Sequence, residues 1–460
     1  MISSYLPLVL AALILYGYML GRGRIRRVAT VEGVRPHSQT SYYGLYVALW
    51  CGLPAIVIVL CWLLFSPMIV NALVMSSLPG SMTAGLPPAE LDLLRAEIHA
   101  IAGGIVFGEP TPEVLAAADQ LNALRGTSDA AMFVVVTVLA IAAIAWARRH
   151  IATQFRARNS VEKTTFWLMV LCSVIAIVTT IGIVLSLLVE SFRFFELVPV
   201  GEFLFGTNWE PQMPIREDQV AGLGAFGAMP VFAGTLLISV IAMAIAVPIG
   251  LLTAMYLAEY AHGKVRATVK PVIEILAGVP TIVYGFFAVL TVAPWLREMG
   301  ASIGIPVAPN SAIAAGAVMG IMITPFISSL SDDALHAVPQ NLRDGAAALG
   351  ATKRETILQV VFPAALPGIV GGVLLAASRA IGETMIVVMA AGLIANATAN
   401  PFEAVTTVTV QIVTLLIGDT EFDSPKTLAA FALGLLLFVV TLGLNLIALM
   451  VTKKYRERYE

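Results

Sequence analysis

Nine long apolar segments constrain this chain more than any other feature of its sequence. A helix needs about 20 mostly apolar residues to cross a bilayer, and each segment has about seventeen or more. Hydrophobic residues make up 58% of the chain and charged residues only 12%, so the sequence predicts an all-α polytopic membrane protein. The predicted spans are 4–20, 44–66, 131–147, 166–189, 230–258, 269–294, 311–330, 364–393 and 427–451.

The basic residues indicate how these spans are oriented. Of the 27 Lys and Arg residues, 20 follow the first, third, fifth, seventh or ninth span, and Arg379 falls deep inside the eighth. Loops rich in Lys and Arg stay on the cytoplasmic side. We therefore expect the N-terminus outside and the C-terminus in the cytoplasm.

The chain divides near residue 160. Residues 1–160 hold three spans and an external loop at 76–130, in which acidic residues outnumber basic ones. Apolar residues at helical spacing after Pro87 and again after Pro112 predict two short amphipathic helices in this loop. Their apolar faces either pack on each other and on the membrane surface or dock an external partner. Residues 161–460 hold the other six spans.

A polar helical hairpin lies between the seventh and eighth spans, in the cytoplasmic loop 331–363. Pro339 can open a first helix and Gly350 can end it as a left-handed C-cap. Thr352 to Glu355 reads as a capping box that starts a second helix, which we expect to stop near Pro363. The first helix is expected to present one face to a partner: Leu342, Ala346 and Leu349.

Two charged residues fall deep inside the predicted eighth span. Arg379 and Glu383 are four residues apart, so in a continuous helix they share one face and can pair. An unpaired charge at membrane depth costs about 2.5–3.5 kcal/mol, which favours placement toward the bundle interior. The pair either fixes helix packing or lines a path for an anion, because the planar guanidinium suits phosphate oxygens. An Arg neutralised by Glu383 would hold an anion weakly, as a conduit requires.

Two prolines predict breaks in the sixth and seventh spans, Pro280 and Pro325. Each proline lacks an N–H and frees the carbonyl four residues before it, which a nearby hydroxyl can satisfy. The candidate hydroxyls are Thr281, Tyr284, Thr324, Ser328 and Ser329.

Motifs in the C-terminal part resemble those of a known family. Residues 344–363 are similar to the EAA loop of ATP-binding-cassette (ABC) transporter permeases, E-A-A-x3-G-x9-I-x-L-P. Residues 379–385, Arg-Ala-Ile-Gly-Glu-Thr-Met, resemble the R-A-x-G-E-T-M signature of PstC-type phosphate permeases. Residues 203–211, 278–285 and 324–330 fit the same family in the same order. The resemblance covers residues 165–460 and leaves the role of 1–160 open.

The resemblance implies a six-helix permease core, in a bacterial inner membrane, that imports inorganic phosphate. Its partners would be a second, PstA-like permease, a PstB-like ATPase dimer and an external PstS-like phosphate-binding protein. The residues that would couple to the ATPase are Asp344, Gly345, Ala346, Leu349, Gly350, Thr352, Glu355 and Pro363. The translocation path would contain Arg379, Glu383, Thr384, Thr281, Tyr284, Thr324 and Ser328.

Other functions find less support in the sequence. No G-x4-G-K-[ST] motif occurs, so we expect ATP to be hydrolysed by a partner and no cofactor to be bound by this chain. The five His residues share no ligand spacing, which argues against a metal site. A net charge of −2 gives no indication of nucleic-acid binding. The open alternatives are a permease for molybdate, sulfate or phosphonate, an ion-coupled secondary carrier that works alone, and a non-transporting sensor or scaffold.

Overall fold

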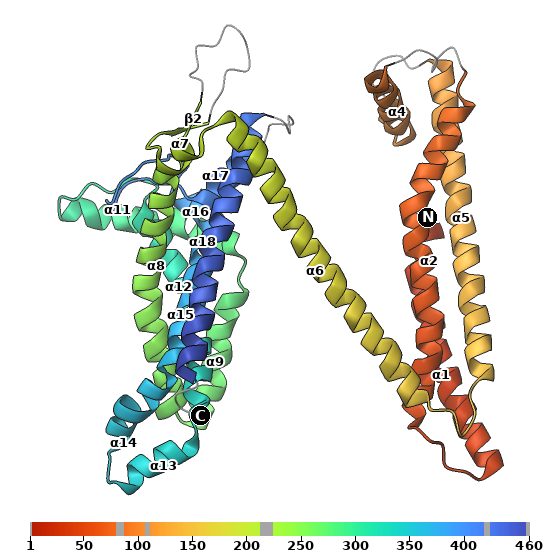
Figure 1. Cartoon of the computed structure of the whole chain (residues 1–460), viewed down its shortest axis with the longest axis horizontal. Helices are drawn as coiled ribbons and strands as arrows, with labels where there is room; N and C mark the ends of the chain where they lie inside the picture. Colours follow the sequence, from red (N-terminus) through yellow and green to blue (C-terminus); the bar gives the residue numbers. More distant parts are fainter. Residues whose placement is uncertain (1, 80–86, 106–110, 212–223, 418–423, 457–460) are drawn as a thin grey trace. The chain divides into compact units, whose positions relative to one another are not determined.

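The structure, a computed structural model, describes residues 2–79, 87–105, 111–211, 224–417 and 424–456. The chain forms two compact units, unit 1 (Met1–Ile177) and unit 2 (Val178–Glu460). The boundary between the units falls inside one long helix, α6 (Ala157–Leu197), which contains no proline (Figure 1). Each unit has its own apolar cores.

Unit 1 is a bundle of three long helices, α1 (Ile2–Glu32), α2 (Thr40–Ser77) and α5 (Pro112–Arg149). Their shared core contains Tyr43 and Val136, and the Tyr43 hydroxyl donates to the Phe155 carbonyl at 2.9 Å. This bond closes the end of the bundle where α5 turns into the next segment.

The segment predicted as the external loop 76–130 is mostly helical where it is described. The first amphipathic helix is α4 (Pro88–Ala102), and the second is the first part of α5 rather than a separate helix. It continues into the span because no proline interrupts α5 after Pro112. Ile98 of α4 packs with Leu121 of α5 and Val74 of α2, so the two apolar faces do pack on each other. Residues 80–86 and 106–110 of the predicted loop lie outside the described residues.

Unit 2 contains the remaining elements, some of them π-helical turns (η). After α6 they are α7 (Val200–Phe205), β1 (Trp209–Glu210), β2 (Ala225–Phe226), α8 (Met229–Met255), η1 (Tyr256–Tyr260), α9 (Gly263–Gly278), α10 (Thr281–Phe287), η2 (Ala288–Val292), α11 (Ala293–Ser302), α12 (Ala312–His336), α13 (Gln340–Ala348), α14 (Lys353–Glu355), η3 (Thr356–Val361), α15 (Phe362–Ile381), α16 (Met385–Ala390), α17 (Val408–Leu416) and α18 (Pro425–Arg456). The two strands pair antiparallel, with Trp209 opposite Phe226.

Nine helices in the described residues are long and apolar enough to cross a membrane, which confirms the predicted number. Two spans are displaced along the sequence from their predicted positions, whereas the other seven overlap nearly all of the predicted segment. The sixth candidate span is Thr281–Ser302 rather than 269–294, because the chain turns at Pro280 and leaves α9 as a separate helix. The eighth is Lys353–Ile381 rather than 364–393, because the helix ends at Gly382.

Two of the prolines do not end their helices, contrary to the prediction. Pro325 lies inside α12, which runs unbroken from Ala312 to His336. The helix that starts at Lys353 also continues past Pro363, because the preceding turn η3 is π-helical and α15 begins at Phe362, which puts Pro363 in its first turn. The wider π-helical turn before Pro363 leaves room for the proline ring, which would clash with the preceding turn of a regular α-helix.

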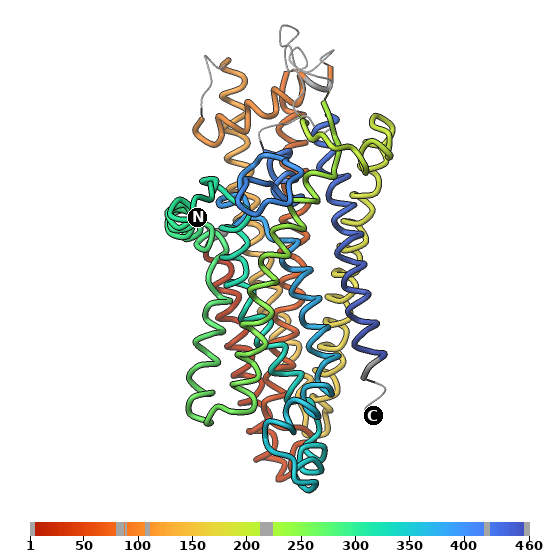
Figure 2. The backbone as a smooth tube through the Cα atoms, turned by 90° about the vertical axis from the view of Figure 1, so that its left-hand side faces the viewer, coloured from red at the N-terminus to blue at the C-terminus, as the bar shows by residue number. Residues whose placement is uncertain are grey.

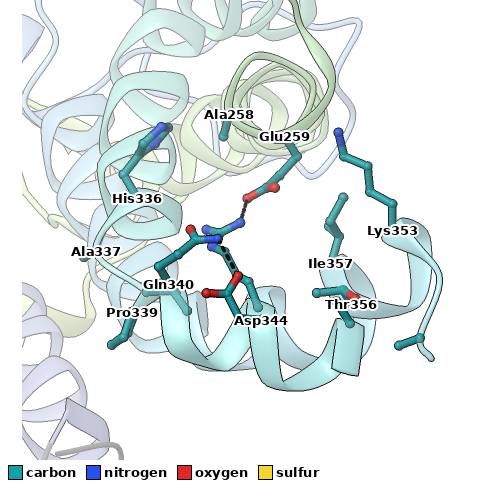
Figure 3. Close-up of a pocket in the computed structure, with 14 residues that line it drawn as sticks. Ala258, Glu259, His336, Ala337, Pro339, Gln340, Asp344, Lys353, Thr356 and Ile357 are labelled. Atoms are coloured by element: carbon teal, nitrogen blue, oxygen red, sulfur yellow. Dashed lines mark hydrogen bonds and ion pairs between the residues drawn. The ribbon is translucent and has the colours of Figure 1, made fainter. Parts of the chain in front are cut away.

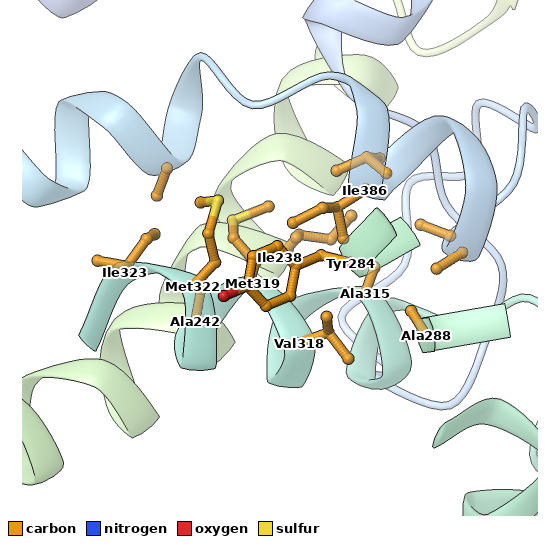
Figure 4. Close-up of a cluster of buried hydrophobic side chains, with 14 of the residues drawn as sticks. Ile238, Ala242, Tyr284, Ala288, Ala315, Val318, Met319, Met322, Ile323 and Ile386 are labelled. Carbon is orange, nitrogen blue, oxygen red and sulfur yellow. The ribbon is translucent and has the colours of Figure 1, made fainter. Parts of the chain in front are cut away.

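The largest core of unit 2 joins α8, α10, α12 and α16 (Figure 4). Ile238 of α8, Met319 and Ile323 of α12, Tyr284 of α10 and Ile386 of α16 meet there. Figures 1 and 2 show α13 and α14 at one end of this unit, and α7, β2 and α17 at the other. The predicted ATPase-coupling residues and the predicted path residues therefore lie in different parts of unit 2.

Candidate functional site

The helical hairpin predicted from the sequence is present, and its two caps form as predicted. Pro339 precedes α13, and Gly350 follows it with φ +83°, a left-handed conformation that favours glycine. The N–H groups of Gly350 and Ala351 donate to the carbonyls of Ala347 and Ala346 at 3.0 and 3.1 Å. These bonds close the first helix without a flexible linker.

The second helix of the hairpin begins with the predicted capping box. The Thr352 N–H donates to Glu355 Oε2 at 2.8 Å, and the Glu355 N–H donates to Thr352 Oγ1 at 3.4 Å. On the first helix Leu342 is partly exposed, Ala346 is half-buried and Leu349 is 91% exposed. Leu349 therefore projects from the tip of a rigid turn with almost no packing around its side chain.

Arg343 attaches the hairpin to the body of unit 2. Its Nη1 forms an ion pair with Glu259 of η1 (Figure 3). Its Nη2 donates to the Leu335 carbonyl at 2.8 Å. The sequence around Glu259 offers Lys264, Arg266 and Lys270 as partners, but the carboxylate pairs with Arg343 instead. The π-helical turn η1 carries Glu259 to the hairpin, whose arginine lies 84 residues further along the chain.

A pocket of about 750 Å³ opens between the hairpin and the body. Figure 3 shows its wall, which comes from η1, the end of α12, α13 and η3. Gln340 donates to Asp344 at 3.1 Å along one side, and Lys353 lies 5.2 Å from the centre of the Tyr260 ring. The EAA-like residue Asp344 thus stays in contact with its own helix and is exposed to solvent.

The predicted pair of Arg379 and Glu383 does not form in the structure. α15 ends at Ile381, so the four-residue spacing no longer places both side chains on one helical face. Arg379 is exposed, and its guanidinium lies 5.8 Å from the centre of the Phe326 ring. Glu383 Oε1 instead accepts from the Met385 N–H at 3.1 Å, which satisfies one of the orphan donors of α16. Within the described residues, no ion pair is recorded for the Arg379 guanidinium.

Two of the predicted hydroxyls satisfy backbone carbonyls. The Tyr284 hydroxyl donates at 2.7 Å to the Leu276 carbonyl, which also accepts from the Val279 N–H at 3.3 Å. Pro280, four residues after Leu276, has no N–H to donate to this carbonyl. Thr324 Oγ1 donates to Gly320 O at 2.8 Å within α12. The structure therefore gives Tyr284 and Thr324 a role in helix geometry.

The other predicted path residues lie on α12 or at the starts of α10 and α16. Ser328 is buried in α12, Thr281 begins α10 and Thr384 is the N-cap of α16. No group of three or more His, Cys, Asp or Glu side chains in the described part of the chain is arranged to hold a metal ion.

Family models match both halves of the chain. Residues 7–179 match a model described as phosphate ATP-binding cassette transporter, and residues 246–457 match binding-protein-dependent transport system inner membrane component. A probable ABC transporter permease protein YqgH of Bacillus subtilis is 32% identical over 272 residues, covering 59% of this chain and 84% of the relative. The chain belongs to the family of ABC-transporter permeases.

Relatives named phosphate transport system permease protein PstC match this permease at a similar level. The protein of Mesorhizobium japonicum is 33% identical over 288 residues, covering 58% of this chain and 83% of its own length. PstC 1 of Mycobacterium bovis is 33% identical over 271 residues, covering 54% and 80%. A crystal structure of a bacterial alginate ABC transporter, with an alginate-bound periplasmic protein, contains a chain similar to 65% of this one at 15% identity and TM-score 0.46, over 97% of that chain.

A buried carboxylate in the permease escaped the sequence analysis. Asp332, with its side chain 3% exposed near the end of α12, accepts from Lys270 Nζ at 2.7 Å and from Arg266 Nη2 at 3.0 Å. His336 Nδ1 lies 3.3 Å away. The hydrogen bond from Lys270 to Asp332 raises the pKa of that ammonium, so it stays charged. The sequence contained one signal for this site. Asp332 comes just after the apolar span 311–330, and the basic residues Arg266 and Lys270 follow the fifth span on the same predicted side of the membrane.

Removing this carboxylate should destabilise the permease. Asp332→Ala leaves two partly exposed cations close together without their shared partner, which we expect to cost about 2 kcal/mol after solvent screening. The matched control is Asp333→Ala. Asp333 is the neighbouring acid, but it is 71% exposed and its carboxylate lies 4.0 Å from Lys270, at the limit of an ion pair. Thermal unfolding of the detergent-solubilised protein should show a midpoint several degrees lower for Asp332→Ala alone. Equal shifts in the two variants would contradict a structural role for the buried cluster.

Proposed function

We propose that this permease imports inorganic phosphate as one subunit of an ATP-driven transporter and has no catalytic activity of its own. The observation that carries the proposal is the doubly capped hairpin, with Leu349 bare at its tip, in a chain whose relatives are named phosphate permeases. Leu349 is 91% exposed on a rigid turn. A protein groove that buries such a side chain gains about 1.5–3 kcal/mol, and no rearrangement of the hairpin is needed.

The partners of the proposed transporter follow from its parts. A PstB-like ATPase dimer would grip the hairpin, a PstA-like permease would complete the path, and a PstS-like binding protein would deliver phosphate at the opposite end. The hairpin then lies in the cytoplasm, which places the N-terminus outside and the C-terminus inside the inner membrane, in agreement with the charge distribution. ATP would bind the partner rather than this chain.

Force from the ATPase would enter unit 2 through Arg343. The ion pair with Glu259 and the bond to the Leu335 carbonyl join the hairpin to η1 and to α12. Both partners of Arg343 belong to helices that form the largest core of unit 2. Glu259 lies on η1, which continues α8, and Leu335 lies on α12. A push on α13 would therefore move the helices that contact the path, not the hairpin alone.

Arg379 would attract the anion in this path. Its guanidinium rests on the Phe326 ring, and no carboxylate pairs with it within the described residues. An unpaired Arg attracts a divalent oxyanion more strongly than the neutralised Arg that the sequence suggested. A conduit needs only a weak attraction, because tight binding would trap the ion.

Uptake of radiolabelled phosphate tests the proposal. Cells that lack this chain should lose high-affinity uptake and regain it with the wild-type protein. Excess unlabelled phosphate should compete, whereas sulfate and molybdate at the same concentration should not. Competition by sulfate or molybdate with equal strength would assign the permease to another oxyanion. Uptake by the purified chain without nucleotide or partners would identify a secondary carrier instead.

A further inference from the structure

The break between α15 and α16 has a backbone carbonyl that neither helix satisfies. Glu383 lies after the last residue of α15 and before the N-cap of α16, Thr384, whose own carbonyl accepts from Val388 N–H at 2.9 Å. The Glu383 carbonyl accepts instead from Thr409 Oγ1 of α17 at 2.8 Å. Thr409 follows Glu383 by 26 residues, so this is a tertiary bond to the break and not part of either helix.

The Thr409 hydroxyl has a fixed direction. It carries one proton, and the bond to the Glu383 carbonyl uses it, so the neighbouring Thr407 hydroxyl at 3.0 Å must donate to Thr409. Both threonines are buried, with Thr409 8% exposed, and water competes little for either bond. A donor chain therefore runs from Thr407 through Thr409 into the backbone at Glu383.

α17 is a firm support for this chain because its start is tied to α8. The Val408 N–H donates to Thr235 Oγ1 of α8 at 3.0 Å. One residue earlier on α8, a Cβ at Gly234 would collide with the Thr406 carbonyl, so glycine there lets the segment before α17 lie directly on the helix.

A buried glutamine fixes the middle of α17. Gln411, 6% exposed, donates from Nε2 to the Leu393 carbonyl at 3.0 Å and to Thr406 Oγ1 at 3.2 Å, and its Oε1 accepts from Trp209 Nε1 at 2.9 Å. α17 is thus joined to β1 and to the segment that follows α16. In that segment, hydrogen bonds from Thr398, Asn400 and Asn396 lower the pKa of Glu403 and keep its carboxylate charged.

We propose that Thr409 is a positioning residue of the translocation path, which fixes the helix break at Glu383 by bonding it to the anchored helix α17. The inference rests on the proposed function, because it takes Arg379 and Glu383 as parts of the path. The Glu383 side chain accepts from the Met385 N–H of α16, and the Glu383 carbonyl accepts from Thr409 of α17. The break is therefore fixed by one bond to the helix that follows it and one bond to α17. Loss of the Thr409 bond frees one side and lets the break sample conformations that do not conduct.

Transport by the reconstituted complex tests Thr409 directly. Thr409→Val keeps the volume of the side chain and removes the donor, and we expect the maximal rate of phosphate uptake to fall about five- to tenfold, as expected for one buried hydrogen bond. The phosphate KM should stay within about twofold, because one bond at the break does not alter phosphate capture. Thr409→Ser keeps the hydroxyl and should restore the rate. The matched control is Thr441→Val, which removes a hydroxyl that donates only within α18, to the Leu437 carbonyl at 2.9 Å.

Thiol labelling adds a readout that altered stability would not move. Thr384→Cys, placed in a variant whose Cys51, Cys61 and Cys172 are replaced by Ala, reports how open the break is to a small thiol reagent. Adding Thr409→Val should raise the labelling rate at least about fivefold, while adding Thr441→Val should leave it unchanged. This measurement works on the assembled complex even where uptake is too slow to follow.

Two outcomes would overturn the proposal. One is an unchanged uptake rate together with unchanged labelling in Thr409→Val, and the other is an equal loss of rate in Thr409→Val and Thr409→Ser. The Arg379→Ala variant separates this inference from the proposed path. If Arg379→Ala abolishes uptake while Thr409→Val transports normally, only the positioning role fails. If Arg379→Ala transports normally, the path itself is wrongly placed.

Discussion

Leu349→Asp should separate the permease from its ATPase while leaving the permease folded and inserted. The wild-type leucine is 91% exposed and Gly350 holds it at the tip of the hairpin, so its replacement removes no packing within the chain. In a complex the same position would lie in an apolar groove, where a carboxylate is costly to desolvate. Loss of the buried leucine and the added charge together predict an affinity at least about a hundredfold weaker. Copurification of the ATPase with the tagged permease measures this.

The control for Leu349 comes from the other unit. Leu93 on α4 is 70% exposed, so Leu93→Asp introduces the same charge at a similarly bare position. It should leave the ATPase bound, because α4 lies in the segment assigned to the outside. Leu349→Met should also retain binding, since it keeps an apolar side chain of similar size. ATPase recovery with Leu349→Asp equal to wild type would exclude the hairpin tip as the docking point.

The sequence predicted the hairpin well because its signals are local. The capping box joins Thr352 to a residue three positions away, and the C-cap needs only Gly350 in the left-handed region. Such bonds depend on neighbouring residues and not on the rest of the fold. The number of spans was also predictable, because bilayer thickness sets the length of each apolar segment.

Contacts between distant segments were beyond the sequence. Glu259 and Arg343 are 84 residues apart, and Asp332 and Arg266 are 66 apart. Each acid had several basic residues nearby in sequence, and only the packing of α9, α12 and α13 selects its partner. One amino-acid sequence by itself does not specify which basic residue pairs with each acid.

The end of α15 was the costliest error for the site. The segment 364–393 is apolar enough to read as one helix, and a continuous helix would pair Arg379 with Glu383. Thr409 instead satisfies the carbonyl exposed by a break after Ile381, and Glu383 caps the next helix. The break leaves Arg379 without the predicted carboxylate partner, and the Thr409 bond that accompanies it comes from 26 residues away.

Arg379→Ala should abolish phosphate uptake, by at least about a hundredfold, while the complex still assembles. The loss on folding is small, because a cation over an aromatic ring at an exposed site contributes about 0.5–1 kcal/mol. The loss on transport is large, because Arg379 is the cation that the sequence places deep inside a predicted span. Uptake by cells and copurification of the ATPase, measured on the same variant, distinguish the two effects.

Arg379→Lys tests whether planar recognition matters beyond charge. Lys retains the cation but lacks the fork of donors that matches two phosphate oxygens, so we expect uptake to fall about tenfold. The control is Arg297→Ala on α11, an exposed arginine of the same unit, which should transport normally. Glu383→Gln sharpens the comparison, because its amide oxygen can still accept from Met385 N–H while the charge is lost. If Arg379 acts without a carboxylate partner, as the geometry indicates, Glu383→Gln should release phosphate as fast as the wild type. Slower release in Glu383→Gln would show that Glu383 neutralises Arg379 during transport.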